Sequence, residues 1–159
     1  MAKLTHLDAE GRARMVDVTE KAVTQRVAIA RGTIFMRPET LSLIMEKKIE
    51  KGDVFSVARV AGIMAAKRTP ELVPMCHPLN ITSVEIFLTP EQNPARVEIE
   101  AVVKVGGQTG VEMEAMTAVA VSGLTIYDMC KAVDREMSIG EIRLVKKSGG
   151  KSGTFIRKE

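Results

Sequence analysis

The chain has 159 residues, 45% of them hydrophobic, 27% charged and 3% aromatic, and a formal net charge of +3 at pH 7. This length suits one domain with a sizeable core, and the composition excludes an intrinsically disordered chain. No apolar run approaches the ~18 residues that a membrane-spanning helix needs, and the N-terminus shows no signal-peptide core, so we expect a cytoplasmic protein with no membrane partner.

The numbers of cysteine, histidine and aromatic residues restrict the kinds of site that the chain can contain. Two cysteines, Cys76 and Cys130, cannot form a disulfide framework, and two histidines are too few for a dedicated transition-metal site. The mild positive charge suits an anionic ligand. With no Trp, one Tyr and four Phe, the chain lacks a stacking platform for nucleic acid, so we expect a small-molecule ligand instead.

The first half of the chain predicts an arm, a strand and two helices. Residues 1–20 are polar and aperiodic, and we interpret them as a flexible N-terminal arm. Residues 23–36 alternate apolar with polar positions and contain many β-branched side chains, which is typical of a strand. Pro38 suits the first position of a helix that would run to about Gly52, and Asp53 can cap a second helix.

The second half predicts strands around one long helix. The proline-rich residues 69–80 indicate a connection without regular structure. Strands are expected at 81–88 and 95–105, joined by the turn-like TPEQNP, and again at 141–147. The Gly/Ser/Lys-rich residues 149–159 predict a flexible C-terminal tail.

The long helix lies within residues 109–135, and we expect the rest of the chain to be organised around it. Thr109-Gly110 precedes two carboxylates, as is common where a helix begins. Residues 115–127 carry no charge, so we expect this helix to be covered on nearly every side. Charge returns at Asp128.

This order of elements matches the split βαβ pattern of the ferredoxin-like α+β folds. In these folds an antiparallel sheet carries its helices packed on one face. We take residues 21–148 as a single catalytic α+β domain, and we expect its open sheet face or edges to serve in self-association. Alternation in residues 95–105 predicts which side chains face the helices: Val97, Ile99, Ala101, Val103 and Val105.

Cys76-His77-Pro78 is the first candidate site. A histidine flanked by prolines lies on an extended backbone, so its ring can be aimed at a ligand with little loss of entropy. The alternative is a packed loop with a structural His77. Cys76 could be a nucleophile, but nothing near it in the sequence favours a thiolate over an inert buried thiol.

Asp128 and Lys131 are the second candidate, three residues apart and therefore on one helix face. Such a pair can share a proton, or it can be an ordinary surface ion pair. Lys51, Lys67 and Lys147 lie where elements end, and amines there suit phosphate oxygens if they converge on one pocket.

The length of the helix adds a constraint. Glu114 and Asp128 are fourteen residues apart, which is about 21 Å along a helix. If both ends of the helix line a pocket, one small substrate cannot touch both ends within one subunit. We therefore expect a pocket to which a neighbouring subunit donates one helix end.

Three stretches resemble one known family: VPMCHPLN at 73–80, GVEMEAMTAVAVSGLTIYDMCKAVD at 110–134, and KKSGGKSG at 146–153. Further likeness at 6–8 and 15–18 extends the resemblance over nearly the whole chain. On these motifs the chain resembles the cyclic pyranopterin monophosphate synthase family of molybdenum cofactor biosynthesis.

The resemblance implies a reaction and an assembly. The substrate would be (8S)-3′,8-cyclo-7,8-dihydroguanosine 5′-triphosphate, handed over by an upstream radical cyclase, and a lyase reaction would yield cyclic pyranopterin monophosphate and pyrophosphate. The subunits would form a homohexamer, a trimer of dimers, with active sites at interfaces. No cofactor is implied, although a divalent metal could assist, and no ligand set for one is evident.

The resemblance also assigns residues. Asp128 would be the catalytic acid/base and Lys131 would work beside it. Substrate-binding residues would be Met75, Cys76, His77, Met113, Glu114, Lys51, Lys67, Lys147 and Glu112.

Two other functions remain open. A nucleotide-sensing module would bind ligand without turnover and would not need Asp128. An RNA-binding protein using the basic tail would bind with a steep salt dependence and would lose function on deletion of residues 148–159.

Overall fold

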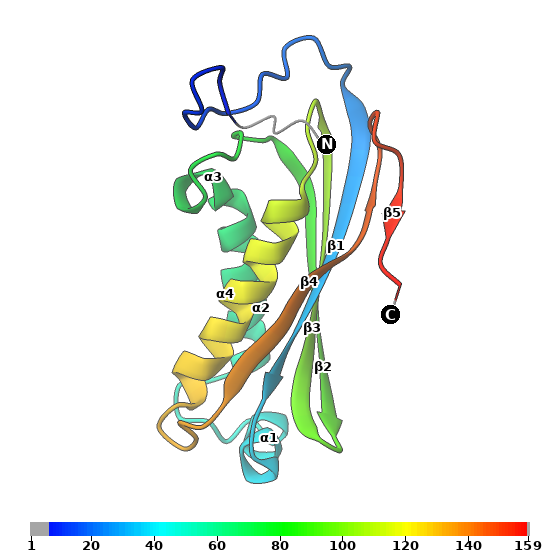
Figure 1. Ribbon diagram of the computed structural model, residues 1–159. Helices are drawn as coiled ribbons and strands as arrows, with labels where there is room; N and C mark the ends of the chain where they lie inside the picture. Colours follow the sequence, from blue (N-terminus) through cyan, green and yellow to red (C-terminus); the bar gives the residue numbers. More distant parts are fainter. Residues whose placement is uncertain (1–6, 159) are drawn as a thin grey trace.

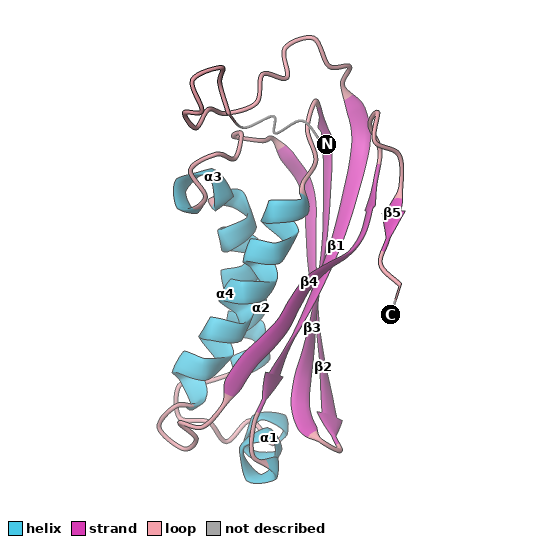
Figure 2. Ribbon diagram, viewed as in Figure 1, coloured by secondary structure: helices cyan, strands magenta, loops and turns pink. Residues whose placement is uncertain are grey.

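The fold is one antiparallel sheet with its helices gathered against one face (Figures 1 and 2). A computed structural model describes residues 7–158. The strands are β1 (Thr24–Phe35), β2 (Ile81–Gln92), β3 (Ala95–Gly107), β4 (Ser138–Ser148) and β5 (Phe155–Ile156), and the helices are α1 (Pro38–Met45), α2 (Val54–Lys67), α3 (Thr69–Leu72) and α4 (Glu112–Cys130). The sheet has five strands in the order β2-β3-β1-β4-β5, which confirms the ferredoxin-like α+β prediction.

The core lies between the sheet and the α2–α4 layer. The alternate residues of β3 from Val97 to Val105 that were predicted to face the helices have no exposed surface. α4 packs along α2, where the Ser122 hydroxyl donates to the Ala58 carbonyl at 3.1 Å. Gly62 lies against both Ala118 and Ser122, so the two helices run antiparallel at close range.

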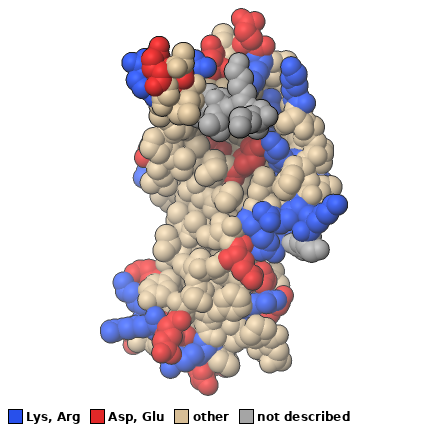
Figure 3. All heavy atoms as spheres, viewed as in Figure 1, with Lys and Arg blue, Asp and Glu red and all other residues tan. Residues whose placement is uncertain are grey.

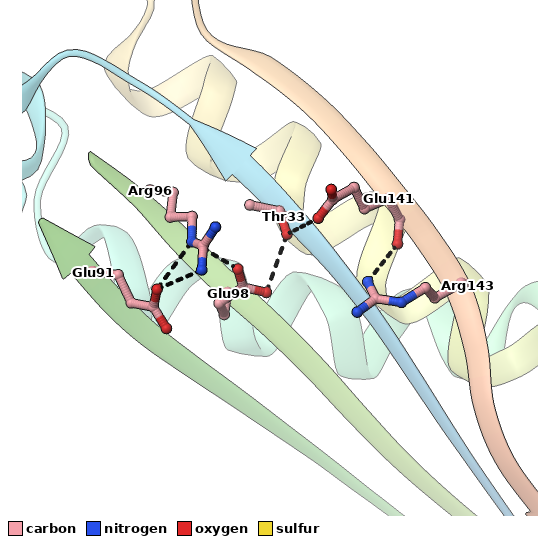
Figure 4. Close-up of polar contacts among 6 residues, drawn as sticks. All are labelled: Thr33, Glu91, Arg96, Glu98, Glu141 and Arg143. Carbon is pink, nitrogen blue, oxygen red and sulfur yellow. Dashed lines mark hydrogen bonds and ion pairs between the residues drawn. The ribbon is translucent and has the colours of Figure 1, made fainter. Parts of the chain in front are cut away.

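The opposite face of the sheet is open and carries a connected set of charges, drawn in Figure 4. Arg96 pairs with Glu91 at 2.6 Å and with Glu98 at 2.9 Å. The Thr33 hydroxyl lies 3.1 Å from Glu98 and 3.2 Å from Glu141. The open face is therefore polar, which is usual for a sheet covered on one side only.

α4 is less covered than its uncharged sequence predicts. Leu124 is 58% exposed and Met113 is 39% exposed, on the face turned away from the sheet. Figure 3 shows charged side chains at the two ends of the molecule and an uncharged band between them over the helices. The expectation that α4 is covered on nearly every side is therefore wrong for the single chain.

Several element boundaries differ from those predicted. α1 ends at Met45 and not near Gly52, because Lys47 adopts a left-handed φ of 55° and its N–H bonds the Ile44 carbonyl. Residues 69–72 form the short helix α3 within a segment predicted to be irregular. β2 continues through Pro90 to Gln92, which the missing N–H allows because β2 is an edge strand.

The caps of the two long helices differ. Asp53 caps α2 as predicted, with its side chain accepting from the Ser56 N–H at 3.0 Å. Thr109-Gly110 does not cap α4, whose N-cap is Val111 with no side-chain cap hydrogen bond. Glu112 and Glu114 in the first turn supply the favourable negative charge instead.

The arm and the tail both lie near the N-terminal end of α4. Gln108 donates to the carbonyls of Thr19 and Lys21 at 3.1 and 3.0 Å, which ties the arm to the β3–α4 connection. In the tail, β5 pairs with β4. Residues 1–6, which include His6, and residue 159 lie outside the described part of the chain. The flexibility of the arm and of the tail stays a prediction. Within residues 7–158, no helix is long and apolar enough to span a membrane.

Candidate active site

One group of candidate residues meets at the C-terminal end of α4. The Lys131 ammonium lies 2.7 Å from Asp128 Oδ1, and the Lys51 ammonium lies 2.9 Å from Oδ2 and 2.8 Å from the Asp128 carbonyl oxygen. Lys51 reaches this point from the loop between α1 and α2. We call Lys51, Asp128 and Lys131 the Asp128 cluster.

The electrostatics of this cluster favour an ionised carboxylate. Hydrogen bonds from Lys131 and Lys51 lower the pKa of Asp128 from 3.8 to about 2. The side chain is 57% exposed, so solvent screens the attraction, but the direction follows from two cations at contact distance. Asp128 is therefore ionised at neutral pH, with an ammonium group on each side of its carboxylate.

A second group meets about 21 Å away along α4, at its N-terminal end. The 75–77 loop and the first turn of α4 line a cavity of about 350 Å³ that also touches the arm at Val16 and Val18. The lining candidates are Met75, Cys76, His77, Glu112, Met113 and Glu114. We call this cavity the His77 pocket. His77 Nε2 lies 2.7 Å from the Val16 carbonyl oxygen, which aims the ring.

Glu114 is the buried acid of the His77 pocket. It is 3% exposed, and burial, aided by the nearby charge of Glu112, raises its pKa from 4.5 to about 7 although its own backbone N–H acts in the other direction. A carboxyl with this pKa can donate or accept a proton near neutrality. Burial and the charge of Glu114 also raise the pKa of the Cys76 thiol, which argues against Cys76 as a nucleophile.

A second cavity, of about 410 Å³, adjoins the His77 pocket and is rich in cations. Lys147 and Glu112 are the candidates that line it, and the Lys147 ammonium lies 3.0 Å from a carboxylate oxygen of Glu112. Lys21, Arg26 and Lys151 also line it and were not among the candidates. Their signal was weak, because Lys21 directly follows the predicted arm and Lys151 falls in the predicted tail.

Two glycines bring the tail close to Arg26. Both have left-handed φ angles, +97° at Gly149 and +75° at Gly150. A Cβ at Gly149 would lie 2.2 Å from the Gln25 carbonyl oxygen, and one at Gly150 would lie 2.1 Å from the Arg26 guanidinium. Gly149 therefore lines the cationic cavity, and Gly150 lets the tail pass close to Arg26, which also lines it.

The structure thus divides the candidates into two sets that do not meet within one chain. Lys51, Asp128 and Lys131 lie at one end of α4, and the residues of the His77 pocket with Lys147 lie at the other. Lys67 ends α2 and lines neither cavity. Among residues 7–158, no group of three or more His, Cys, Asp or Glu side chains is arranged to hold a metal ion.

Comparison with known proteins gives one consistent result. The model of the MoaC family matches residues 15–150. The chain is 65% identical over 158 residues to a protein of Pelotomaculum thermopropionicum, covering 99% of this chain and 93% of that one. It is 62% identical to a protein of Chloroflexus aurantiacus, covering 98% and 95%, and 60% identical to one of Thermomicrobium roseum, covering 100% and 96%. Each relative is named cyclic pyranopterin monophosphate synthase. The chain belongs to the MoaC family.

Proposed function

We propose, from this family membership, that the chain is a cyclic pyranopterin monophosphate synthase of molybdenum cofactor biosynthesis. It would be a lyase that converts the cyclic dihydroguanosine triphosphate into cyclic pyranopterin monophosphate and pyrophosphate. The family match and the 60–65% identity to the named relatives carry the proposal, and the Asp128 carboxylate, held between two ammonium groups at 2.7 and 2.9 Å, supports it. Opening a purine ring and rebuilding a pterin require repeated proton transfers, and this cluster holds both an acceptor and donors.

Asp128 and Lys131 are the proposed catalytic pair. Because Asp128 is ionised at neutral pH, its carboxylate is the proposed proton acceptor of the pair, and a proton for the substrate is proposed to come from an ammonium beside it. After donating, the neutral amine can recover a proton through the carboxylate. Acid and base roles are then divided between adjacent groups.

The His77 pocket is the proposed binding site for the purine-derived part of the substrate. Met75, Cys76 and Met113 offer soft apolar surface, and His77 and Glu114 offer polar groups at fixed positions. Lys147 in the adjoining cationic cavity, with Lys51 and Lys67 at other element ends, is proposed to neutralise phosphate charge. Closing the cyclic phosphate breaks the bond to the β-phosphate, and cations stabilise the departing pyrophosphate.

A shared pocket reconciles this assignment with the separation of the two sets. If α4 of a second copy packs antiparallel against this one, the Asp128 cluster of each copy lies beside the His77 pocket of the other. The exposed Leu124 lies between the two sets and, with the exposed Met113 at the edge of the His77 pocket, supplies apolar surface for such contact. A homohexamer built as a trimer of dimers satisfies this requirement.

The remaining parts of the proposal concern the cellular setting. The enzyme would act in the cytoplasm, would receive its substrate from the radical cyclase that makes it, and would need no redox cofactor. Whether a divalent metal assists pyrophosphate departure is decided by assaying turnover with and without a chelator. We propose that turnover proceeds with the chelator present, because cationic side chains can stabilise the departing pyrophosphate in place of a metal ion.

The proposal is tested by following pyrophosphate release from the prepared substrate. Wild type should release pyrophosphate, whereas Asp128→Asn should bind the substrate with turnover reduced by at least about 10²-fold, as is typical for loss of an acid/base group. Glu85→Gln, on the edge strand β2 and outside both sets, is the charge-matched control and should behave as wild type. Tight binding without release by wild type would instead indicate a nucleotide-sensing module.

A further inference from the structure

Asp134 is a buried carboxylate that none of the proposed roles uses. Asp134 is 2% exposed and lies in the turn that follows α4, three positions after Lys131. Buried carboxylates need partners, because an isolated one is strongly unfavourable. The partners of Asp134 come mainly from the start of α1, nearly a hundred residues earlier in the chain.

These contacts cap the N-terminal end of α1 with a side chain that is distant in the sequence. Arg37, the N-cap residue, has no side-chain cap hydrogen bond of its own. Asp134 Oδ2 instead accepts from the Arg37 N–H at 2.9 Å and from the buried Thr40 hydroxyl at 3.0 Å. Oδ1 accepts from the Glu136 N–H at 3.1 Å and lies 3.5 Å from Arg37 Nε. The Arg37 guanidinium in turn donates to the Val133 carbonyl, so the connection runs both ways.

Each side of this connection carries one lysine of the Asp128 cluster. On one side, the turn after α4 is held by bonds from the Lys131 and Asp134 N–H groups to the Tyr127 and Cys130 carbonyls. On the other side, α1 ends in the hydrogen-bonded turn at Lys47, and the loop from there leads to Lys51. Asp134 is therefore a direct tie between the two segments from which the ammonium groups reach Asp128.

We propose that Asp134 is a positioning residue that holds Lys51 and Lys131 on opposite sides of the Asp128 carboxylate. Its catalytic consequence rests on the proposed function, whereas its effect on the geometry of the Asp128 cluster does not. Contacts of 2.7 to 2.9 Å are sensitive to small displacements. A displacement of about 1 Å in a catalytic group can lower a rate about 10²-fold.

Asp134→Asn is the most informative variant. Four donors face the carboxylate, so an amide NH₂ in place of one oxygen leaves at least one buried donor facing another donor. Thr40→Val removes only one donor at constant shape and should give a smaller effect of the same kind, and Thr40→Ser should restore wild-type behaviour. Glu136→Gln is the matched control, with the same change of charge on an exposed neighbour.

Two readouts separate positioning from a purely structural role. The first is the side-chain carboxyl carbon shift of Asp128, followed by NMR from pH 6 to 3.5 in the full chain. The Lys51 and Lys131 ammonium groups are the charged groups that face it. Wild type and Glu136→Gln should change little over this range because the pKa of Asp128 is about 2, and Asp134→Asn should titrate with a pKa nearer 3.8.

The second readout is turnover per folded molecule, measured well below the thermal midpoint of each variant. Asp134→Asn should lose about 10- to 100-fold in kcat with little change in KM. Wild-type titration of Asp128 together with wild-type kcat per folded molecule would overturn the proposal. If wild type itself shows no turnover, the proposed function fails, and the NMR titration still decides whether Asp134 positions the cluster.

Discussion

At the scale of single residues, α4 holds two carboxyl groups in opposite environments. Asp128 is exposed and lies between two cations, so its pKa falls to about 2, whereas Glu114 is buried and its pKa rises to about 7. Pairs of acids whose environments separate their pKa values in this way commonly divide base and acid roles in enzymes. One helix therefore presents an ionised carboxylate at one end and a proton-holding carboxyl at the other.

The raised pKa of Glu114 predicts a pH-dependent loss of stability. Its stabilising neutral form is fully present below the unfolded value near 4.5, and ionisation of the folded state as pH rises through about 7 removes that advantage. Glu114→Gln cannot ionise, so between pH 4.5 and 8 its free energy of unfolding should rise relative to wild type by roughly 2–3 kcal/mol.

Urea unfolding at several pH values and one protein concentration measures this difference. Glu71→Gln removes an exposed carboxyl from α3 and should leave the pH dependence of wild type in place. Parallel curves for wild type and Glu114→Gln would show that Glu114 does not hold its proton in the folded chain.

Lys51 should contribute chiefly to substrate affinity. A charge-assisted hydrogen bond contributes about 1.5–3 kcal/mol, so Lys51→Ala should raise the substrate Kd by about 10- to 100-fold. Calorimetry in an Asp128→Asn background prevents turnover during the measurement. Lys48→Ala removes a nearby lysine whose ammonium lies against Glu46 and should leave the Kd unchanged. Equal affinities for the Lys51 and Lys48 variants would remove Lys51 from the binding site.

At the scale of elements, the close packing of α2 on α4 sets where the two candidate sets lie. Because the helices are antiparallel, the start of α2 lies beside the end of α4, which brings the Lys51 loop to Asp128. Gly62 makes this approach possible, since a Cβ there would lie 2.3 Å from the Ser122 hydroxyl and 3.1 Å from the Ala118 carbonyl oxygen.

Gly62→Ala should therefore destabilise the fold although alanine favours helices. The overpacking is expected to cost about 1–3 kcal/mol, more than the ~1 kcal/mol gained from helix propensity. Thermal unfolding measures the balance. Gly140→Ala is the control, because nothing lies within 4 Å of its added Cβ. A Gly62→Ala variant more stable than wild type would show that the helices can separate at little cost.

The same scale explains what the sequence could predict. Local periodicity was sufficient for β1, β3 and α2, because each buries one regular face, whereas the centre of α4 was predicted from its uncharged run. The end of α1 was missed because Lys47, and not a glycine, takes the left-handed position that stops the helix. β2 was cut short because Pro90 usually excludes a strand, and only the sheet order shows that β2 is at an edge.

The candidate site could likewise be predicted only where the sequence carries a local signal. The Asp128–Lys131 pair could be predicted because i, i+3 spacing fixes proximity on a helix. The Lys51 contact spans 77 residues and depends on helix packing that has no local signal. Lys21, Arg26 and Lys151 were missed because their convergence depends on how the arm and the tail meet across β1.

At the scale of the whole molecule, the two sets lie at opposite ends of a 19-residue helix, with the exposed Leu124 between them. The open face of the sheet is charged and its charges are paired, so the helical face is the better surface for close apolar contact. The proposed shared pocket accounts for both the separation of the two sets and the exposed apolar surface of α4. In that proposal, a second copy would cover the exposed face of α4 and complete the site.

Mixing inactive variants tests this account most directly. Asp128→Asn disables one end of the helix, and the double variant His77→Ala, Lys147→Ala disables the other. Refolded together, they should recover about a quarter of wild-type pyrophosphate release, because half of randomly formed pairs are mixed and one of the two sites in a mixed pair is intact. Mixing Asp128→Asn with Lys131→Ala, which damage the same end, should recover none. Failure of the first mixture to exceed either variant alone, with mixed assemblies shown to form, would contradict the shared site.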